Sequence, residues 1–409
     1  MPNNAIVRLL IACIFFFPLA ARASDPPAAG ITPAPAMVIP AKTIDTREQL
    51  DAYVRDTPAD KSPLHALSPG GQRRFLAGIV YGEHGVGGFS TEDVSYELTR
   101  KQAYALLQLL GMQSYALSLD ARTRPRSVED DQRASVLEGP YDALIAASQA
   151  NDNVPNHSLI RSYEEDFAPR QSDTQWRALD TRDMELLFRA TILIYGRTAQ
   201  SVYLSDARRD FAELDRRHAV DRPHAGELYD ALLRAGQTDE ARALLASHPV
   251  LDRGTTPEMR SAYRVRKGQA SLWIASANKR ELIRFRFNIH APSQVVILGS
   301  AGCHFSVSAA RALEADPLLR DIFRDYAQWV APSADLTDFD ALRAWNRSYP
   351  NMRLGIIYAE AELPMVKRFD TPTFFFLDHG AVVDTVVGWP DGGNLDAIRR
   401  GLREIDLLR

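Results

Sequence analysis

Cysteine is nearly absent from this chain, which has only two cysteines, Cys13 and Cys303, in 409 residues. A small secreted scaffold held together by disulfides is therefore excluded, because such scaffolds are rich in cysteine. Cys13 lies in an N-terminal apolar segment that we expect to be removed. Cys303 would then be the single cysteine of the mature chain, unable to form an intramolecular disulfide, and either buried and inert or a reactive thiol.

Apolar runs long enough to span a bilayer are also absent, and the short run near the N-terminus predicts export. Arg8 precedes an apolar run over residues 9–19, and residues 21–23 (ARA) form an A-x-A cleavage pattern. We expect residues 1–23 to be a signal peptide and the mature protein to be periplasmic or secreted. Residues 10–13 (LIAC) also resemble a bacterial lipobox. Lipoprotein anchoring at Cys13 is the less favoured alternative, because the apolar run continues beyond Cys13.

Neither sign of charge dominates the composition, since the chain has 48 lysines and arginines and 52 aspartates and glutamates. The formal net charge of −4 disfavours a general nucleic-acid binder, which usually carries a basic excess. The patterns G-x-S-x-G and H-E-x-x-H are missing as well, and the glycine-rich stretch around Glu83 and His84 lacks phosphate-loop or metal-ligand spacing. We therefore expect no nucleic-acid partner, cofactor or metal. His218 and His224 lie among charged residues and are expected to be solvated.

Length and patterning predict more than one domain. Residues 24–45 are rich in proline and alanine and read as a linker, whereas residues 46–270 have mainly helical patterning. Within that range, residues 227–249 resemble one tetratricopeptide-type helical hairpin, with Ala235 and Gly236 between two short helices. No second copy follows at the required period. We expect an α-helical, repeat-like domain that offers a surface to a protein partner.

Over residues 280–409, predicted strands alternate with predicted helices. The strands are expected at 281–289, 294–300, 326–331 and 352–359, and a hairpin over 373–389 turns at His379 and Gly380. Helices are expected from about Ser306, over 338–349 and over 394–408. This order predicts a C-terminal α/β domain with a mixed central sheet.

Three features of this order resemble the thioredoxin superfamily. A buried strand over 295–299 leads into residues 303–306 (CHFS) at a helix start, and Thr371 and Pro372 precede the apolar strand 374–377. Gly388 then follows the next strand, where the family often has a glycine. The resemblance implies a thioredoxin-like fold for residues 280–409. It also implies that Pro372 is the cis-proline beside Cys303, where the backbone of a client docks.

The helix start gives Cys303 a chemical reason to be reactive. Unpaired N–H groups and a partial positive charge at a helix N-terminus stabilise a thiolate. His304 could add positive charge, as the equivalent histidine does in strongly oxidising members of the superfamily, or it could be an ordinary exposed residue. Ser306 stands where a resolving cysteine would be. Its hydroxyl can hydrogen-bond the thiolate or cap the helix, but it cannot release a mixed disulfide.

Two departures from the family agree with a one-thiol site. Ile297 replaces the buried acid that helps to deprotonate a resolving cysteine, and Gly302 replaces a common tryptophan. We expect mixed-disulfide exchange with, or holding of, a protein client or small thiol, with a site formed by Cys303, His304, Ser306, Thr371 and Pro372. The alternative is a non-catalytic envelope scaffold with a degenerate thioredoxin-like domain, in which Cys303 is a small buried hydrophobic residue.

Overall fold

The computed structural model describes residues 40, 42–82, 85–127, 135–148, 156–251, 253–262, 264–266, 269–332, 339–359, 362–366, 370–390 and 392–409. The expected signal peptide with Cys13, nearly all of the expected linker, and the pair Glu83 and His84 lie outside these ranges. Within them, no helix combines the length and the apolar character that crossing a bilayer would require.

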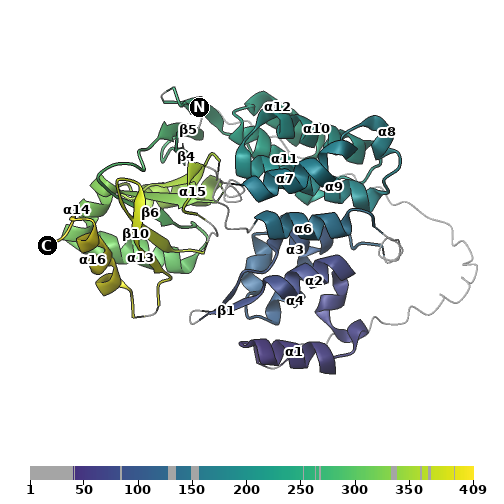
Figure 1. Cartoon of the computed structure of the whole chain (residues 1–409), viewed down its shortest axis with the longest axis horizontal. Coiled ribbons are helices and arrows are strands. Elements are labelled where there is room, and N and C mark those ends of the chain that lie inside the picture. The colour runs from purple at the N-terminus through teal and green to yellow at the C-terminus, as the bar shows by residue number, and fades with distance from the viewer. Residues whose placement is uncertain are drawn as a thin grey trace, which may run out of the picture. The chain divides into compact units, whose positions relative to one another are not determined.

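The first part of the described chain is mainly helical (Figure 1). A short antiparallel hairpin of β1 (Val80–Gly82) and β2 (Gly85–Gly87) interrupts the helices. The helices are α1 (Arg47–Asp56), α2 (Pro69–Gly78), α3 (Thr91–Glu97), α4 (Arg100–Gln108), α6 (Glu138–Ser148), α7 (His157–Asp166), α8 (Asp173–Trp176), α9 (Thr181–Thr198), α10 (Ser201–Arg216), α11 (Arg222–Arg234) and α12 (Thr238–Ser247).

Helix α9, an 18-residue helix, is largely buried. The side chain of Asp180 caps its N-terminus by accepting a hydrogen bond from the backbone N–H of Asp183. Met184, Leu187 and Phe188 are completely buried in one apolar core with residues of α6, α7, α10 and α11. The helical region therefore has its own apolar core.

The predicted hairpin at Ala235 and Gly236 is confirmed. Helix α11 begins after Asp221, whose carboxylate and the side chain of His224 form a capping box, and ends at Arg234. Gly236 has a φ of +75°, a conformation that glycine adopts without strain. Helix α12 follows at Thr238, so the small residues at the turn let the chain reverse within a few positions.

The predicted mixed sheet is also confirmed. Among the described residues, eight strands form one sheet in the order β10-β9-β6-β7-β8-β4-β5-β3. Strands β6, β7 and β8 are parallel to one another, and β9 is antiparallel to β6. The strands are β3 (Glu258–Ser261), β4 (Ser271–Ala275), β5 (Glu281–Arg286), β6 (Ser293–Leu298), β7 (Ala327–Ala331), β8 (Leu354–Ile357), β9 (Thr373–Asp378) and β10 (Ala381–Val387).

The sheet begins earlier in the chain than the sequence patterning indicated. Strand β3 lies inside the range 46–270 and joins the sheet by parallel pairing with β5. The helix expected from Ser306 begins at His304 and is divided, because α13 ends at Ala315 and Pro317 starts a second helix, α14. Asp316 accepts hydrogen bonds from two backbone N–H groups of α14 and so caps it.

Four helices pack on one face of this sheet, namely α13 (His304–Ala315), α14 (Pro317–Tyr326), α15 (Phe339–Ser348) and α16 (Leu395–Glu404). Figure 1 shows α13, α14 and α16 beside strands β6 and β10. Parallel crossovers are right-handed, so the successive neighbours β6, β7 and β8 place their connecting helices on the same side. The opposite face carries a second apolar core to which Leu363 and Val366, between β8 and β9, contribute.

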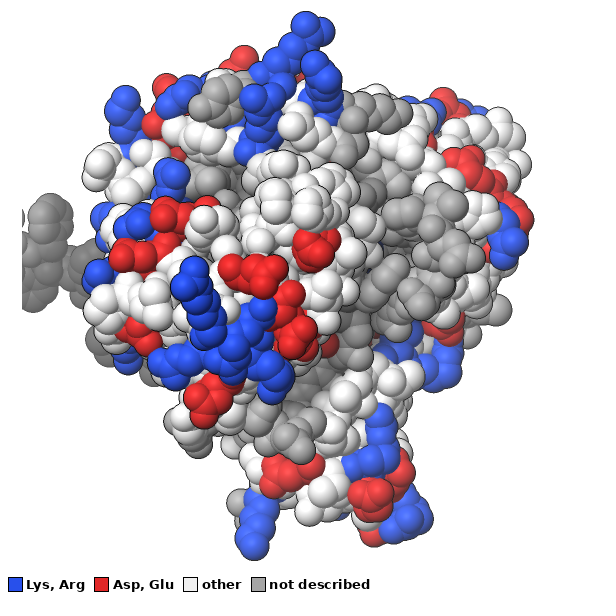
Figure 2. All heavy atoms as spheres, turned by 60° about the vertical axis from the view of Figure 1, so that its left-hand side comes forward, with Lys and Arg blue, Asp and Glu red and all other residues white. Residues whose placement is uncertain are grey.

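Acidic and basic side chains are interspersed on the face of the molecule seen in Figure 2. Neighbouring charges of opposite sign form surface ion pairs, for example between Arg324 and Asp321 at 2.8 Å.

Candidate functional site

Cys303 occupies the turn between a buried strand and the first turn of a helix. Strand β6 ends at Leu298, and Cys303 is the N-cap residue of α13, with extended backbone angles. Its backbone N–H donates to the carbonyl of Ser300 at 3.1 Å, and its carbonyl accepts from Val307 at 3.1 Å. Its side chain is half-buried, and its thiol is free. The sequence expectation of a cysteine at a helix start is confirmed.

The sheet register brings Thr371 and Pro372 beside this cysteine. Because β9 is antiparallel to β6 and Thr373 pairs with Leu298, the chain entering β9 lies next to the chain leaving β6. The Thr371–Pro372 peptide bond is cis, and Cys303 Sγ lies 3.5 Å from the carbonyl oxygen of Thr371. A thiol at this distance donates a weak hydrogen bond. Two segments almost seventy positions apart thus form one site.

Neighbouring contacts fix the Thr371–Pro372 segment. The hydroxyl of Thr373 donates to the carbonyl of Asp370 at 2.6 Å, and the backbone N–H of Gly388 donates to the carbonyl of Pro372 at 2.8 Å. Gly388 has a φ of +82°, which favours glycine at this position. Gly388 therefore lies beside Pro372, and its backbone hydrogen bond holds that residue in position.

Ser306 is completely buried and forms a hydrogen bond within the turn that carries Cys303. Its hydroxyl oxygen accepts a hydrogen bond from the backbone N–H of Ser300 at 3.3 Å. No side chain caps α13, so this hydroxyl does not act as the helix cap. A Cβ on Gly299 would lie 2.7 Å from the ring of Trp329 and 3.6 Å from Ser306 Oγ, so the turn is closely packed.

His304 lies on the exposed side of the helix start. Its ring centroid is 3.8 Å from that of Phe305, the next residue, and the two rings are tilted by 38°. Beneath the turn, Ile297 is completely buried and pairs across the sheet with Phe374 and Trp329. The strand side chain below the Cys303 turn is therefore apolar, as expected from an isoleucine at position 297.

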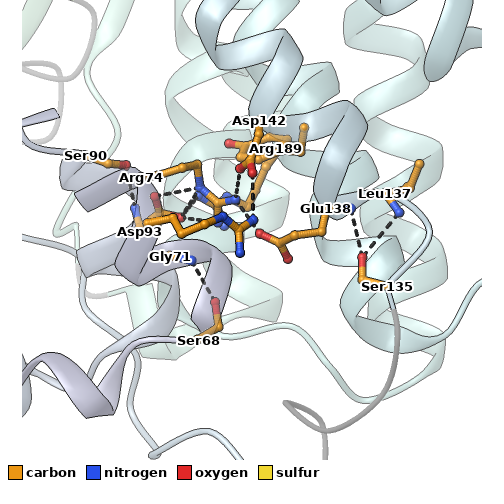
Figure 3. A network of polar contacts seen from close by, with 12 residues as sticks. Ser68, Gly71, Arg74, Ser90, Asp93, Ser135, Leu137, Glu138, Asp142 and Arg189 are labelled. Carbon is orange, nitrogen blue, oxygen red and sulfur yellow. Dashed lines mark hydrogen bonds and ion pairs between the residues drawn. The ribbon is translucent and has the colours of Figure 1, made fainter. Parts of the chain in front are cut away.

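A second constellation, a buried charge network in the helical region, was missed by sequence reasoning (Figure 3). Arg74 of α2 donates to both carboxylate oxygens of Asp93 and, at 2.7 Å, to Asp142. It also pairs with Glu138. Arg189 of α9 donates to the same Asp93 at 2.7 Å. One carboxylate thus joins two buried guanidinium groups from different helices.

The network changes the ionisation of its members. Burial alone would raise the pKa of Asp93, but Arg189 and Arg74 together lower it to about 2. The guanidinium of Arg189 also lies 4.8 Å from the ring centroids of Tyr96 and Tyr141. These contacts hold α2, α3, α6 and α9 together, which is a structural role.

The expectation that His224 is solvated is wrong. His224 is completely buried, its ring lies 5.1 Å from that of Tyr96, and its Nδ1 accepts from the backbone N–H of Asp221. Burial and, to a lesser degree, nearby Arg122 lower the pKa of His224 to about 3, so it is neutral near pH 7. Residues 221–224 (DRPH) carried a signal for this helix start in the sequence. An aspartate two positions before a proline is typical of a capped helix N-terminus.

No group of three or more histidine, cysteine, aspartate or glutamate side chains in the described ranges is arranged to hold a metal ion. No family model, curated protein or solved structure matches the chain. The site around Cys303 is therefore interpreted from its own geometry.

Proposed function

We propose that this is an exported, thioredoxin-like protein that uses Cys303 as a single thiol for mixed-disulfide exchange with, or covalent holding of, a protein client or small thiol. One observation carries the proposal. A half-buried free thiol sits at the N-cap of a twelve-residue helix, 3.5 Å from the Thr371 carbonyl that precedes a cis-proline. Export rests on the N-terminal sequence pattern alone.

The position of the thiol suits a nucleophile. A helix N-terminus presents N–H groups and a partial positive charge, which favour an anion at this point. Cys303 is itself the N-cap residue of α13, so its sulfur is the side-chain atom that the sequence places at this helix end. Because the thiolate is the reactive form of cysteine, this placement favours attack on a disulfide.

The reaction needs no cofactor. The Cys303 thiolate attacks one sulfur of a client disulfide, a new S–S bond joins Cys303 to that sulfur, and the other client sulfur leaves as a thiolate. Release requires an external thiolate to attack the mixed disulfide, which returns Cys303 as the thiolate. Ser306 cannot replace that external thiol, because a hydroxyl does not carry out thiol–disulfide exchange and its oxygen is engaged with Ser300.

The neighbouring residues have more modest roles in this proposal. By analogy with the thioredoxin superfamily, Thr371 and Pro372 would meet the extended backbone of a client beside the sulfur. His304, which is exposed, would contact the client or the solvent. Ser306 would hold the turn that carries Cys303.

Trapping of adducts tests this function. Cells that produce the protein are acid-quenched, alkylated and analysed on non-reducing gels, beside cells that produce Cys303→Ala. We expect reducible adducts that depend on Cys303. Their complete absence would instead favour the alternative function, a non-catalytic scaffold that binds its partner through helices such as the α11–α12 hairpin.

A further inference from the structure

Helices α3 and α11 pack against each other in the helical region and bring several acidic side chains together. Glu92 and Tyr96 are four residues apart and so share one face of α3, and His224 and Glu227 likewise share one face of α11. The edge-to-face contact of the Tyr96 and His224 rings, with centroids 5.1 Å apart, shows that these two faces meet. None of these residues belongs to the Cys303 site.

Few ion pairs neutralise the carboxylates on and beside these faces, although the guanidinium of Arg189 lies 4.8 Å from the ring centroid of Tyr96. Asp120 and Asp230 share Arg253, which lies 3.5 Å from Asp230 and is also paired with Asp120. Glu92 accepts a hydrogen bond from the hydroxyl of Tyr141 at 3.0 Å. In the described ranges, no cationic side chain forms an ion pair with Glu92 or Glu227.

Asp120 lies close to the same stretch of α11. A Cβ added to Gly226 would lie 2.6 Å from a carboxylate oxygen of Asp120, so this carboxylate rests against the backbone next to Glu227. A guanidinium nitrogen of Arg253 would lie 3.2 Å from the same Cβ, so the absence of a side chain at Gly226 leaves room for the Asp120–Arg253 ion pair beside Glu227.

A buried hydroxyl without a partner lies among these carboxylates. Tyr96 is 3% exposed, and its hydroxyl has no hydrogen-bond partner within the described parts of the chain. Burial raises the pKa of Tyr96, Glu227 and Glu92 raise it further, and Arg189 opposes them, so both carboxylates and this guanidinium lie near the tyrosine. Buried hydroxyls nearly always have a partner, which can be a protein group, an ordered water or a polar group of a ligand.

For two of these carboxylates, nearby arginines only partly offset the effect of burial on the pKa. Burial, reinforced by Glu92 and Asp230, raises the pKa of Glu227 to about 8, although Arg234 opposes the shift. Burial also raises the pKa of Asp230 to about 7, despite the opposing effect of Arg253. A cation next to these groups would favour their ionised forms.

We propose that Glu92, Tyr96 and Glu227 form a binding site for a protonated primary amine, carried either by a small molecule or by a lysine side chain. The stoichiometry of hydrogen bonds fits, because an ammonium group has three N–H donors and the site offers two carboxylates and one hydroxyl oxygen. Glu92 and Glu227 are each half-buried, so the site is open to solvent on one side. This proposal is independent of the chemistry of Cys303.

Calorimetric titration of the full chain tests the proposal, with cadaverine as a free amine and Nα-acetyl-lysine methylamide as a peptide-borne amine. We expect at least one probe to bind with release of protons, because the amine selects the ionised form of Glu227. Below pH 8, affinity should fall by up to about tenfold for each pH unit, since fewer Glu227 side chains are ionised. Binding of cadaverine alone indicates a free amine, and binding of the lysine derivative alone indicates a protein-borne one.

Variants complete the test. Glu227→Gln should weaken binding by about tenfold or more and abolish its pH dependence, and Tyr96→Phe should weaken binding without changing that dependence. Glu404→Gln, at an exposed glutamate of α16, should bind as the unchanged protein does. Failure of both probes to bind overturns the proposal. If Glu227→Gln does not fold, unchanged affinity in Tyr96→Phe together with pH-independent binding overturns it equally.

Discussion

The sulfur of Cys303 lies 3.5 Å from the carbonyl oxygen of Thr371, a residue 68 positions later in the chain. The antiparallel register of β6 and β9 creates this contact, since Leu298 pairs with Thr373. It places the thiol between a helix start and the segment that enters the next strand. The proposed one-thiol chemistry depends on this relationship.

Ser306→Cys should convert the site into one that resolves its own adducts. A thiol at the last position of C-x-x-C, three residues after Cys303, attacks the mixed disulfide at Cys303 and releases the client. We expect adducts that are abundant with the unchanged protein to become scarce with Ser306→Cys on non-reducing gels. Ser306→Ala serves as the control and should keep them. Equal adduct yields for Ser306→Cys and Ser306→Ala would argue against client release by a second thiol here.

Gly299→Ala should destabilise the protein by about 1–3 kcal/mol, because the added methyl group would overpack the turn against Trp329. Gly302→Ala is a matched control in the same turn, since its Cβ would meet nothing closer than Ser300 Oγ at 3.8 Å. Urea unfolding measures both free energies. Similar stability of the two variants would contradict the close packing described for this turn.

Asp210 should make the protein less stable as the pH rises. Its carboxylate accepts hydrogen bonds from Gln171 and Thr191, both at 2.9 Å, yet burial outweighs them and raises its pKa to about 7. The folded protein therefore binds this proton more tightly than the unfolded chain, whose aspartate titrates near pH 4. Stability should fall between about pH 4 and pH 7, by up to about 1.4 kcal/mol for each pH unit.

Asp210→Asn keeps an oxygen acceptor and removes the charge. We expect a higher free energy of unfolding than in the unchanged protein above pH 7, and a flatter pH dependence between pH 4 and pH 7. Asp239→Asn alters an exposed carboxylate and should leave the pH dependence as it was. Chemical unfolding at several pH values distinguishes these results, and parallel curves for Asp210→Asn and the unchanged protein would refute the assignment.

Arg189→Met should destabilise the helical region by about 3–5 kcal/mol, because it leaves the carboxylate of Asp93 buried with one of its two guanidinium partners lost. Adding Asp93→Asn should recover part of that loss, since the carboxylate that lost one of its two partners is then neutral. A double-mutant cycle on the free energy of unfolding measures the coupling. Additive effects would show that the two side chains do not interact energetically.

Local patterns predicted the parts of the fold that depend on local signals. The hairpin at His379 and Gly380 and the turn at Gly236 follow from turn residues between periodic segments. Strand β3 could not be predicted in this way, because its four residues are mostly exposed and it exists through pairing with β5. Strand β4 is buried throughout and shows no alternation.

The same distinction between local signals and long-range contacts applies to the Cys303 site and to the buried charge network. Cys303 and Pro372 carry local signals, a helix start and a proline before an apolar strand, and the register of β6 and β9 brings them together. The partners of Arg74 and Arg189 come from distant helices, and nothing in the neighbouring sequence indicates which carboxylate meets which guanidinium. The burial of His224 depends equally on residues far along the chain.

The rate of alkylation of Cys303 by iodoacetamide, measured from pH 5 to pH 9 in a full chain carrying Cys13→Ala, tests the central claim most directly. The same chain unfolded in guanidinium chloride provides the reference rate. A thiolate stabilised at the start of α13 should make the folded protein react about tenfold faster than the unfolded chain near pH 6. A folded protein that reacts no faster than the unfolded chain at any pH would contradict a reactive thiol at Cys303.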